Sequence, residues 1–285
     1  VFGRRPHRHM NGYSLNGRFK AGLVLPVSVT EPYFSHGQGL FETLRTWNSR
    51  PVFLAAHLHR MRTTADLLDL GPMPTNAEVA RWIENLVNRL KLKHARVRLH
   101  HLCRSDGSAD MLITADPVEP MRRLFDPVAV GIAAPIFARG IAMAGLKTMN
   151  YMVNRLAERD ARKRGFSEAL FATTDGLLLE GTRTSLFAVL DGVLTTPSLD
   201  LPILPGVTRA AVLIAARQGG LTVAERGFSV HDLERASEAF LTGSVGGIRP
   251  IQRFENAHFV PIPGPLTSRV ADLAWAMLEH SLELP

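Results

Sequence analysis

A lysine at position 147 is the first residue whose setting could support covalent chemistry. It stands before a helix-like segment in "LKTMNYMVNRLAERDARKRG", with Tyr151 four residues further on. A lysine amine can form an imine with a carbonyl carbon, although most lysines are solvated surface residues. Other segments must therefore decide between a nucleophile and a surface charge.

A carboxylate ends an apolar run in "LLLEGTRTSLFAV". Glu180 follows three leucines, 177–179, in this segment. A carboxylate at the end of a buried strand needs a partner, and a protonated ring nitrogen would be one. A surface position at a strand end is the alternative.

Two further segments favour the binding of a phosphate. In "ILPGVTRAAVL", Gly206 allows close backbone approach, and Val207 and Thr208 open the next helix. Free N–H groups and the helix dipole at such a terminus attract an anion. The turn at 242–244 in "FLTGSVGGIRP" adds further N–H and hydroxyl donors. Each segment by itself also fits an ordinary capped helix or turn.

One cofactor needs an amine, a carboxylate and phosphate donors together. Pyridoxal 5′-phosphate (PLP) binds a lysine through its aldehyde, keeps its ring nitrogen protonated with an acid, and requires donors around its phosphate. The sequence therefore predicts PLP as the cofactor and no metal ligand.

The order and spacing of these segments resemble the class IV, fold-type IV PLP-dependent aminotransferases. This family includes branched-chain and D-amino acid aminotransferases, R-selective amine transaminases and aminodeoxychorismate lyases. The resemblance runs from about Leu15 to Pro250, with the core "KTMNY", "EALFATTDGLLLEGTRTSLFAVLDGVLTTP", "ILPGVTR" and "FLTGS". It implies a mixed α/β (α+β) fold of two domains, like that of D-amino acid aminotransferase. It also implies a homodimer.

The resemblance implies a role for each matching position. Lys147 resembles the Schiff-base lysine, which also moves the proton between the substrate α-carbon and the cofactor. Tyr151 is similar to the tyrosine that binds the cofactor's phenolic oxygen, and Glu180 to the partner of the pyridine nitrogen. The other matches are the apolar residue on the ring face, Leu204, and the phosphate donors Arg60, Val207, Thr208 and Ser244.

Several positions depart from the family pattern. "GQG" at 37–39 stands where Gly-Asp-Gly is common, and Ser185 stands where asparagine is common. Branched-chain enzymes commonly carry Tyr-x-Arg where this chain has Arg96 and Arg98, which counts against a branched-chain substrate. The candidates for contacting the substrate, mostly through its carboxylate, are Arg96, Arg98, Arg104, Arg183, Arg249 and Val245.

The leading prediction is an aminotransferase that moves an amino group between a small amino acid and a 2-keto acid. The alternative with the same chemistry is 4-amino-4-deoxychorismate lyase, which releases p-aminobenzoate and pyruvate. "LTGSVGGIRPI" favours the lyase, whereas "TG" before the serine favours the aminotransferase. An alternative of another class is a non-catalytic PLP-binding protein, against which the intact Lys147 and Glu180 argue.

The composition fits a globular enzyme. Of 285 residues, 46% are apolar and 21% are charged. Residues 1–30 carry five positive charges of the net +7 and no acid, so the basicity lies mostly in this arm. No zinc-finger spacing or RNA-binding aromatic motif accompanies it, so nucleic-acid binding by this arm is the weakest hypothesis. Cys103 is the one cysteine, which excludes an internal disulfide and suits the cytoplasm. No apolar run is long enough to span a membrane, and the N-terminus lacks a signal-peptide pattern.

Proline and charge patterns predict the domain limits. We expect a disordered basic extension over 1–12, a smaller domain over 13–118, a linker over 119–127 and a larger cofactor-binding domain over 128–285. Apolar periodicity and turn signals predict the elements. The expected strands are 13–19 with a turn at Asn16-Gly17, 39–47, 95–104, 128–135, 168–173, 176–180, 185–197 with a turn at Asp191-Gly192, and 238–244. The expected helices are 57–71, 77–92, one that ends at Gly165, 206–220 and 266–282.

Overall fold

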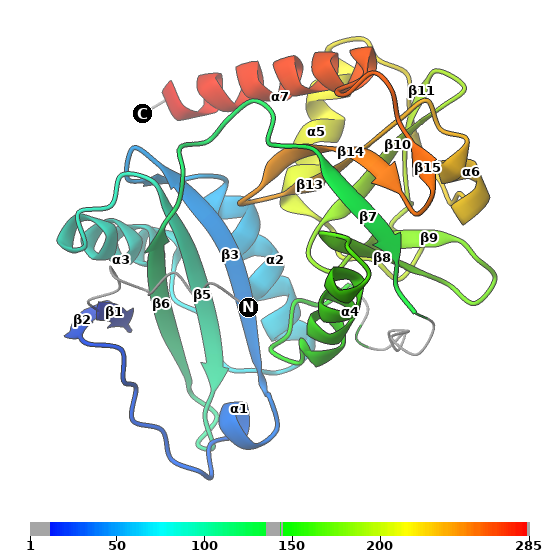
Figure 1. Cartoon of the computed structure of the whole chain (residues 1–285). Coiled ribbons are helices and arrows are strands. Elements are labelled where there is room, and N and C mark those ends of the chain that lie inside the picture. The colour runs from blue at the N-terminus through cyan, green and yellow to red at the C-terminus, as the bar shows by residue number, and fades with distance from the viewer. Residues whose placement is uncertain (1–11, 135–142, 144, 284–285) are drawn as a thin grey trace. The chain divides into compact units, whose positions relative to one another are not determined.

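The computed structural model describes residues 12–134, 143 and 145–283 (Figure 1). The chain divides into two compact units, which we call unit 1 (1–121 and 147–150) and unit 2 (122–146 and 151–285). The segment 147–150 belongs to unit 1, whereas the expected domain limits gave it to the C-terminal domain. Nearly all of the predicted basic extension lies outside the described residues.

Unit 1 contains a six-stranded sheet in the order β2-β1-β6-β5-β3-β4. The β1–β2 hairpin turns at Asn16 and Gly17, both at positive φ, as the sequence predicts. The paired strands are antiparallel throughout. Their bounds are β1 Gly12–Leu15, β2 Arg18–Ala21, β3 Gly39–Trp47, β4 Arg50–Pro51, β5 Ala95–Cys103 and β6 Ala109–Pro117.

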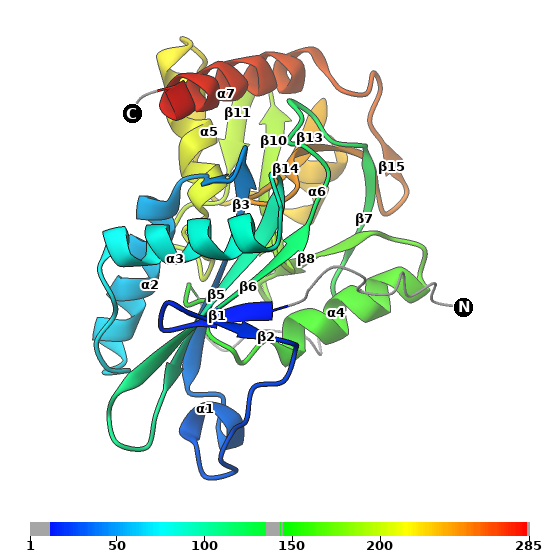
Figure 2. The ribbon, with the colours of Figure 1, turned by 90° about the vertical axis from the view of Figure 1, so that its left-hand side faces the viewer.

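Helices cover one face of this sheet (Figure 2). They are α2 (Leu54–Leu67) and α3 (Asn76–Arg89), and the short α1 (Pro32–Ser35) precedes β3. The predicted apolar face of α2 is correct for Leu58, Met61 and Ala65, which are buried. It is wrong for Leu68, which is 36% exposed because the helix ends at Leu67 and the helical periodicity stops there.

The alternation of β5 sorts its residues between the two faces of the sheet. Val97, Leu99 and Cys103 are buried and belong to the apolar core under the helices. Successive side chains of a strand point to opposite faces, so the arginines 96 and 98 and His100 lie on the other face. Chemistry on unit 1 can therefore use the face that α2 and α3 do not cover.

Unit 2 contains a nine-stranded sheet. Eight strands follow the order β12-β11-β10-β13-β14-β7-β8-β9, and β15 pairs with β14. The predicted hairpin turn at Asp191-Gly192 joins β10 and β11, with both residues at positive φ. The bounds are β7 Val128–Ile132, β8 Glu168–Ala172, β9 Leu178–Gly181, β10 Ser185–Leu190, β11 Val193–Thr196, β12 Val223–Glu225, β13 Glu238–Gly243, β14 Gly247–Phe254 and β15 Ala257–His258.

In the described part of unit 2, four helices accompany this sheet: α4 (Met152–Lys163), α5 (Val207–Gln218), α6 (Val230–Glu234) and α7 (Pro265–Glu283). Helices α5 and α7 lie side by side (Figures 1 and 2) and share a core with strands β10 and β13.

The helix α4 forms as predicted but presents a different face to the core. The prediction used Met152 and Leu156, which are 70% and 37% exposed. Ala157 and Ala161 are fully buried instead. Small side chains allow the helix to lie close to the sheet, so the alanines and not the longer apolar residues face the core.

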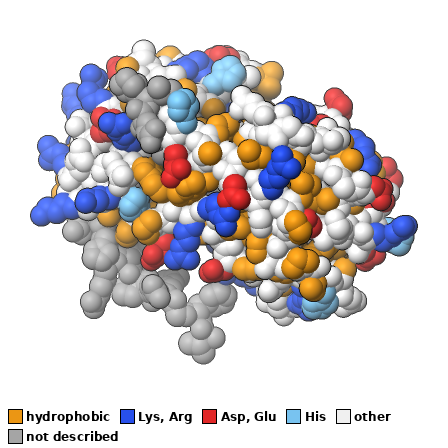
Figure 3. Space-filling view, turned by 90° about the horizontal axis from the view of Figure 1, so that it is seen from above, with side chains coloured by type: hydrophobic (Ala, Val, Ile, Leu, Met, Phe, Trp, Pro, Cys, Tyr) orange, Lys and Arg blue, Asp and Glu red, His pale blue; other side chains and the backbone are white. Residues whose placement is uncertain are grey.

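None of the described helices combines the length and the apolar character needed to cross a bilayer. On the face shown in Figure 3, basic and acidic side chains are intermixed among the described residues.

Candidate active site

The segment 147–150 is attached to the start of β3 by backbone pairing. The Phe41 N–H donates to the Lys147 carbonyl at 3.0 Å, and the Met149 N–H donates to the Gly39 carbonyl at 2.9 Å. A Cβ on Gly39 would lie 2.9 Å from the backbone carbonyl oxygen of His101 and 2.7 Å from the Met149 sulfur, so glycine suits this approach. The last glycine of "GQG" thus serves to seat the lysine segment.

An aromatic ring lies under two cationic groups in unit 1. The Lys147 Nζ is 4.5 Å from the centroid of the Phe41 ring, and the Arg98 guanidinium carbon is 4.8 Å from the same centroid. Such distances correspond to cation–π contacts. The structure therefore brings a predicted nucleophile and a predicted carboxylate binder to one aromatic ring.

The neighbours of Arg98 on β5 are arranged differently. Arg96 forms an ion pair with Asp116 at 2.5 Å. Burial, together with the Arg98 charge, lowers the pKa of His100 to about 4, so this histidine is neutral at pH 7. Of the two arginines predicted on this strand, Arg98 is the one beside Lys147.

Three other predicted carboxylate binders have partners within their own units. Arg104 pairs with Asp110 at 3.0 Å, and Arg183 pairs with Glu158 at 2.6 Å. The Arg249 Nε donates to the carbonyl of Asp126 at 3.3 Å. Arg98 remains the candidate that shares an aromatic ring with Lys147.

Arg60 on α2 is held by a buried carboxylate on β3. Its Nε and Nη2 each donate to one oxygen of Glu42 at 2.7 Å, and the Nδ1 of His57 lies 2.7 Å from the second oxygen. The Glu42 side chain is 1% exposed and that of Arg60 is 10% exposed. The bidentate pair fixes the orientation of the guanidinium.

The electrostatics of this cluster keep Glu42 charged. Burial alone would raise its pKa, but the Arg60 charge and the hydrogen bonds from Arg60 and His57 lower it to about 2. The sequence analysis named Arg60 and missed both partners. Charged residues inside the apolar segments "GLFETL" and "FLAAHLH" were the signal available.

In unit 2, one carbonyl organises the residues that precede and open α4. The Tyr151 hydroxyl donates to the Thr182 carbonyl at 2.5 Å, and the Asn154 Nδ2 donates to the same oxygen at 2.6 Å. Glu180 lies two residues earlier on β9 and is 5% exposed. The structure therefore ties Tyr151 to the loop that follows Glu180.

The N-terminus of α5 gathers hydroxyl groups in unit 2. The helix starts at Val207, its N-cap Gly206 provides no side-chain cap, and the Thr208 Oγ1 lies 3.4 Å from the Ser244 Oγ. The Thr242 Oγ1 is buried without a hydrogen-bond partner among the described residues. Uncapped N–H groups and nearby hydroxyls form a donor set suited to an anion.

Close packing at this terminus explains its glycine. A Cβ on Gly206 would lie 2.5 Å from the Ser185 Oγ. Ser185 pairs directly with Thr242 across β10 and β13, so the two side chains share a face of the sheet. The remaining predicted contacts near these segments, Val207, Leu204 and Val245, are buried or half-buried.

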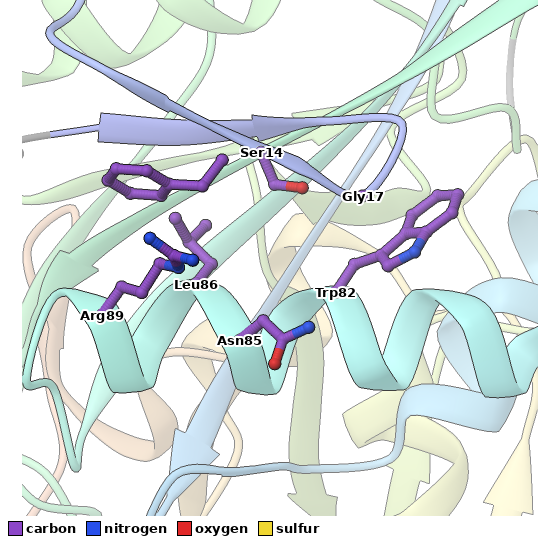
Figure 4. Close-up of a pocket in the computed structure, with 7 residues that line it drawn as sticks. Ser14, Gly17, Trp82, Asn85, Leu86 and Arg89 are labelled. Atoms are coloured by element: carbon purple, nitrogen blue, oxygen red, sulfur yellow. The ribbon is translucent and has the colours of Figure 1, made fainter.

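A separate cavity of about 150 Å³ lies in unit 1 between the β1–β2 hairpin and α3 (Figure 4). It includes none of the predicted site residues, and its lining includes Ser14, Gly17, Trp82, Asn85, Leu86 and Arg89. We therefore assign it no part in the candidate active site.

Comparison with known proteins identifies the family. The model of the amino-transferase class IV family matches residues 39–254. A putative branched-chain-amino-acid aminotransferase of Methanocaldococcus jannaschii is 28% identical over 83% of this chain and 85% of its own length. A bifunctional aminodeoxychorismate lyase / D-amino acid transaminase of Mycobacterium tuberculosis is 31% identical over 73% of this chain and 79% of its own length.

The chain belongs to the class IV aminotransferase family. The structure agrees, since a branched-chain aminotransferase of Thermoproteus uzoniensis, solved with norvaline, superposes with a TM-score of 0.86. That protein is 25% identical, and the match covers 96% of each chain. The fold is thus fold-type IV, as predicted.

Family membership also confirms that the protein is an enzyme and that PLP is its cofactor. The prediction of a non-catalytic protein is therefore not supported. The donor set at α5 fits the phosphate, because the buried Thr242 hydroxyl has no hydrogen-bond partner among the described residues and the N-cap residue Gly206 supplies no side-chain cap. The buried carboxylate of Glu180 fits the ring nitrogen.

Proposed function

We propose that this enzyme transfers an amino group between a small amino acid and a 2-keto acid, and that the Lys147 Nζ holds the cofactor. The observation that carries the proposal is the Phe41 ring, which lies 4.5 Å from the Lys147 amine and 4.8 Å from the Arg98 guanidinium. A reacting amine and a carboxylate binder at one place suit an α-amino acid.

Each predicted residue has a task in this proposal. When bound, PLP supplies a conjugated ring that accepts the electron pair released at the substrate α-carbon. The Lys147 amine would take the proton from the substrate α-carbon and deliver it to the cofactor, and it would move a proton in the reverse direction in the second half of the transfer. Arg98 binds the substrate carboxylate, and Glu180 keeps a proton on the pyridine nitrogen.

The phosphate of the cofactor is assigned two groups of donors. Arg60, oriented by Glu42, is assigned as a donor of positive charge. The N–H groups of Val207 and Thr208, with the hydroxyls of Thr208 and Ser244, are assigned as hydrogen-bond donors. Leu204 packs on the ring face in this proposal, and Val245 contacts the substrate.

A lyase acting on 4-amino-4-deoxychorismate is the second candidate. The relative from Mycobacterium tuberculosis carries both a lyase and a D-amino acid transaminase in its name. The chain also has Ser244, Gly247 and Pro250 at the spacing found in lyase-like members. Against a branched-chain substrate stands Arg96, which occupies the place of the family tyrosine and is paired with Asp116.

One assay separates the two candidates. The purified enzyme, loaded with PLP, is incubated with alanine or glutamate in either enantiomeric form plus a 2-keto acid acceptor. It is incubated separately with 4-amino-4-deoxychorismate and no acceptor. A new amino acid formed at the acceptor's expense supports transfer, whereas pyruvate released without an acceptor assigns the lyase.

The role of Arg98 has a matched control on the same strand. We expect Arg98→Gln to raise KM for the amino acid about tenfold or more, because a charge-assisted pair contributes about 1.5–3 kcal/mol. Arg96→Gln should leave KM within about twofold, since its partner is Asp116. Equal effects of the two substitutions would contradict the assignment.

We also propose that the enzyme is a homodimer of the cytoplasm. In unit 1, the segment 23–34 exposes four large apolar side chains, with Leu23, Val24, Val29 and Phe34 between 55% and 78% exposed. Exposed apolar groups in one segment are typical of a contact surface. Light scattering should give twice the chain mass, and Val24→Lys with Phe34→Lys should shift it toward the monomer.

A further inference from the structure

A buried carboxylate at the start of β8 has no part in the chemistry described above. Glu168 is 5% exposed, and its Oε1 accepts from the Thr182 N–H at 3.1 Å and the Thr182 Oγ1 at 2.5 Å. The same oxygen accepts from the Ala169 N–H at 3.0 Å, and the Oε2 accepts from the Thr184 Oγ1 at 3.3 Å. Four donors therefore satisfy one carboxylate.

The loop 181–184 is packed tightly around this carboxylate. A Cβ on Gly181 would lie 2.1 Å from the Thr184 Oγ1 and 3.3 Å from the carboxyl carbon of Glu168. The next residue of the loop is held by another carboxylate, since Arg183 donates to Glu158 at 2.6 Å. The loop has little freedom to change its conformation while these contacts persist.

The carbonyl of Thr182 carries this constraint to the candidate site. It accepts from the Tyr151 hydroxyl at 2.5 Å and from the Asn154 Nδ2 at 2.6 Å. Thr182 is thus fixed by Glu168 through its N–H and hydroxyl, and it fixes Tyr151 through its carbonyl. Glu180 lies two residues before Thr182 in the same segment.

We propose that Glu168 is a positioning residue that, through Thr182, aligns the Tyr151 hydroxyl and the Glu180 carboxylate for the cofactor. The inference rests on the proposed roles of Tyr151 and Glu180 as cofactor contacts. A carboxylate suits this task because it accepts from two donors of one threonine at once. The geometry needs no direct contact between Glu168 and the cofactor.

Two substitutions of the buried Glu168 separate the effect of its charge from that of its hydrogen bonds. Burial raises its pKa, and the Thr182 hydroxyl and the Arg183 charge oppose that rise. Glu168→Gln keeps an acceptor for Thr182 and removes the charge, whereas Glu168→Ala removes every acceptor. The two variants thus separate loss of charge from loss of alignment.

The test is the pH midpoint of the visible absorption band of bound PLP. We expect Glu168→Ala to move this midpoint in the same direction as Tyr151→Phe, by about 0.5–1 unit, and Glu168→Gln to move it less. Combining Glu168→Ala with Tyr151→Phe should add little to the shift of Tyr151→Phe alone, because both act through one hydroxyl.

The control is another buried carboxylate of unit 2. Glu238 is 8% exposed and accepts from the Leu266 and Thr267 N–H groups at 2.9 and 2.7 Å. Glu238→Gln should lower stability without moving the midpoint. A wild-type midpoint in Glu168→Ala, or shifts that add fully in the double variant, would overturn the proposal.

Two further measurements keep the proposal testable. If Glu168→Ala does not fold, Thr182→Val removes one of the four donors and should reproduce part of the shift. In the protein without PLP, the amide protons of 181–184 should exchange faster in Glu168→Ala, or in Thr182→Val if that variant is used instead, and at wild-type rates in Glu238→Gln. Unchanged exchange in Glu168→Ala or Thr182→Val would count against alignment. Failure of the proposed function is recognised separately, because no lysine-bound band would then exist in the wild type.

Discussion

Unit 1 and unit 2 each bury a carboxylate next to predicted site residues, and the two meet different partners. Glu42 in unit 1 contacts Arg60 and His57, and its pKa is lowered to about 2 although burial opposes this. Glu168 in unit 2 accepts from neutral N–H and hydroxyl groups, and burial raises its pKa.

The difference follows from what each carboxylate orients. Glu42 holds a guanidinium that, in the proposed function, presents charge to the phosphate of the cofactor, and an ion pair can orient that charge. Glu168 holds a backbone segment, for which neutral donors are sufficient. Removing the charge should therefore matter greatly in unit 1 and little in unit 2.

The largest expected effect is that of Glu42→Gln. It leaves the buried Arg60 without its charge partner, which we expect to lower the free energy of unfolding by about 3–5 kcal/mol. Urea denaturation followed by tryptophan fluorescence measures this, with the exposed Glu84→Gln on α3 as control. If Glu42→Gln lowered the free energy of unfolding by less than about 1 kcal/mol, the expected difference between the two buried carboxylates would not exist.

The pH dependence of stability should have opposite signs at the two sites. For Glu42, the folded pKa of about 2 lies below the reference value of 4.5, so its contribution of about 3 kcal/mol is present above pH 4.5 and is lost as the pH falls toward 2. For Glu168, the folded pKa is raised, so the ionised form costs stability and the folded state gains as the pH falls through that pKa.

Comparing each wild-type curve with that of its glutamine variant isolates these contributions. The difference in free energy of unfolding between wild type and Glu42→Gln should narrow below pH 4.5. For the other pair, the stability of wild type should rise relative to that of Glu168→Gln as the solution is acidified from pH 8. Parallel curves for either pair would contradict the assigned charge states.

An intermediate effect is expected on cofactor affinity. Arg60→Lys replaces a planar guanidinium by a point charge and loses the bidentate geometry with Glu42. We expect the Kd for PLP to rise about tenfold and the Kd for pyridoxal, which lacks the phosphate, to stay unchanged. Fluorescence titration of both compounds checks this, and equal weakening of both would rule out a phosphate contact.

The smallest expected effect is that of Glu168→Gln on stability. The amide oxygen still accepts from Thr182, so we expect a change within about 1 kcal/mol at pH 7.5. A loss as large as that of Glu42→Gln would show that charge, and not hydrogen bonding, holds the loop 181–184.

The sequence alone predicts those structural features that depend on strong local signals. Lys147 before a helix, the Pro-Gly entry to α5 and the Asn16-Gly17 and Asp191-Gly192 turns depend on neighbouring residues, and the helix and both turns form as expected. The resemblance then assigned roles that spacing alone leaves open.

The rest depends on partners distant in the chain. Arg60 meets Glu42 from 18 residues away, and Thr182 meets Glu168 from 14 residues away, so no local pattern predicts either pair. The strand β6 (Ala109–Pro117) was not predicted, although it ends just before the expected linker over 119–127. The predicted buried face of helix α4 was wrong because alanines, and not Met152 and Leu156, face the core.

The most direct test of the central claim is to locate the cofactor on the chain. The enzyme loaded with PLP is reduced with borohydride, digested and analysed by mass spectrometry, with Lys147→Ala treated in parallel. We predict that the reduced phosphopyridoxyl group is found on Lys147 and that Lys147→Ala carries none and transfers no amino group. Attachment to another lysine, or turnover that survives in Lys147→Ala, would contradict the account.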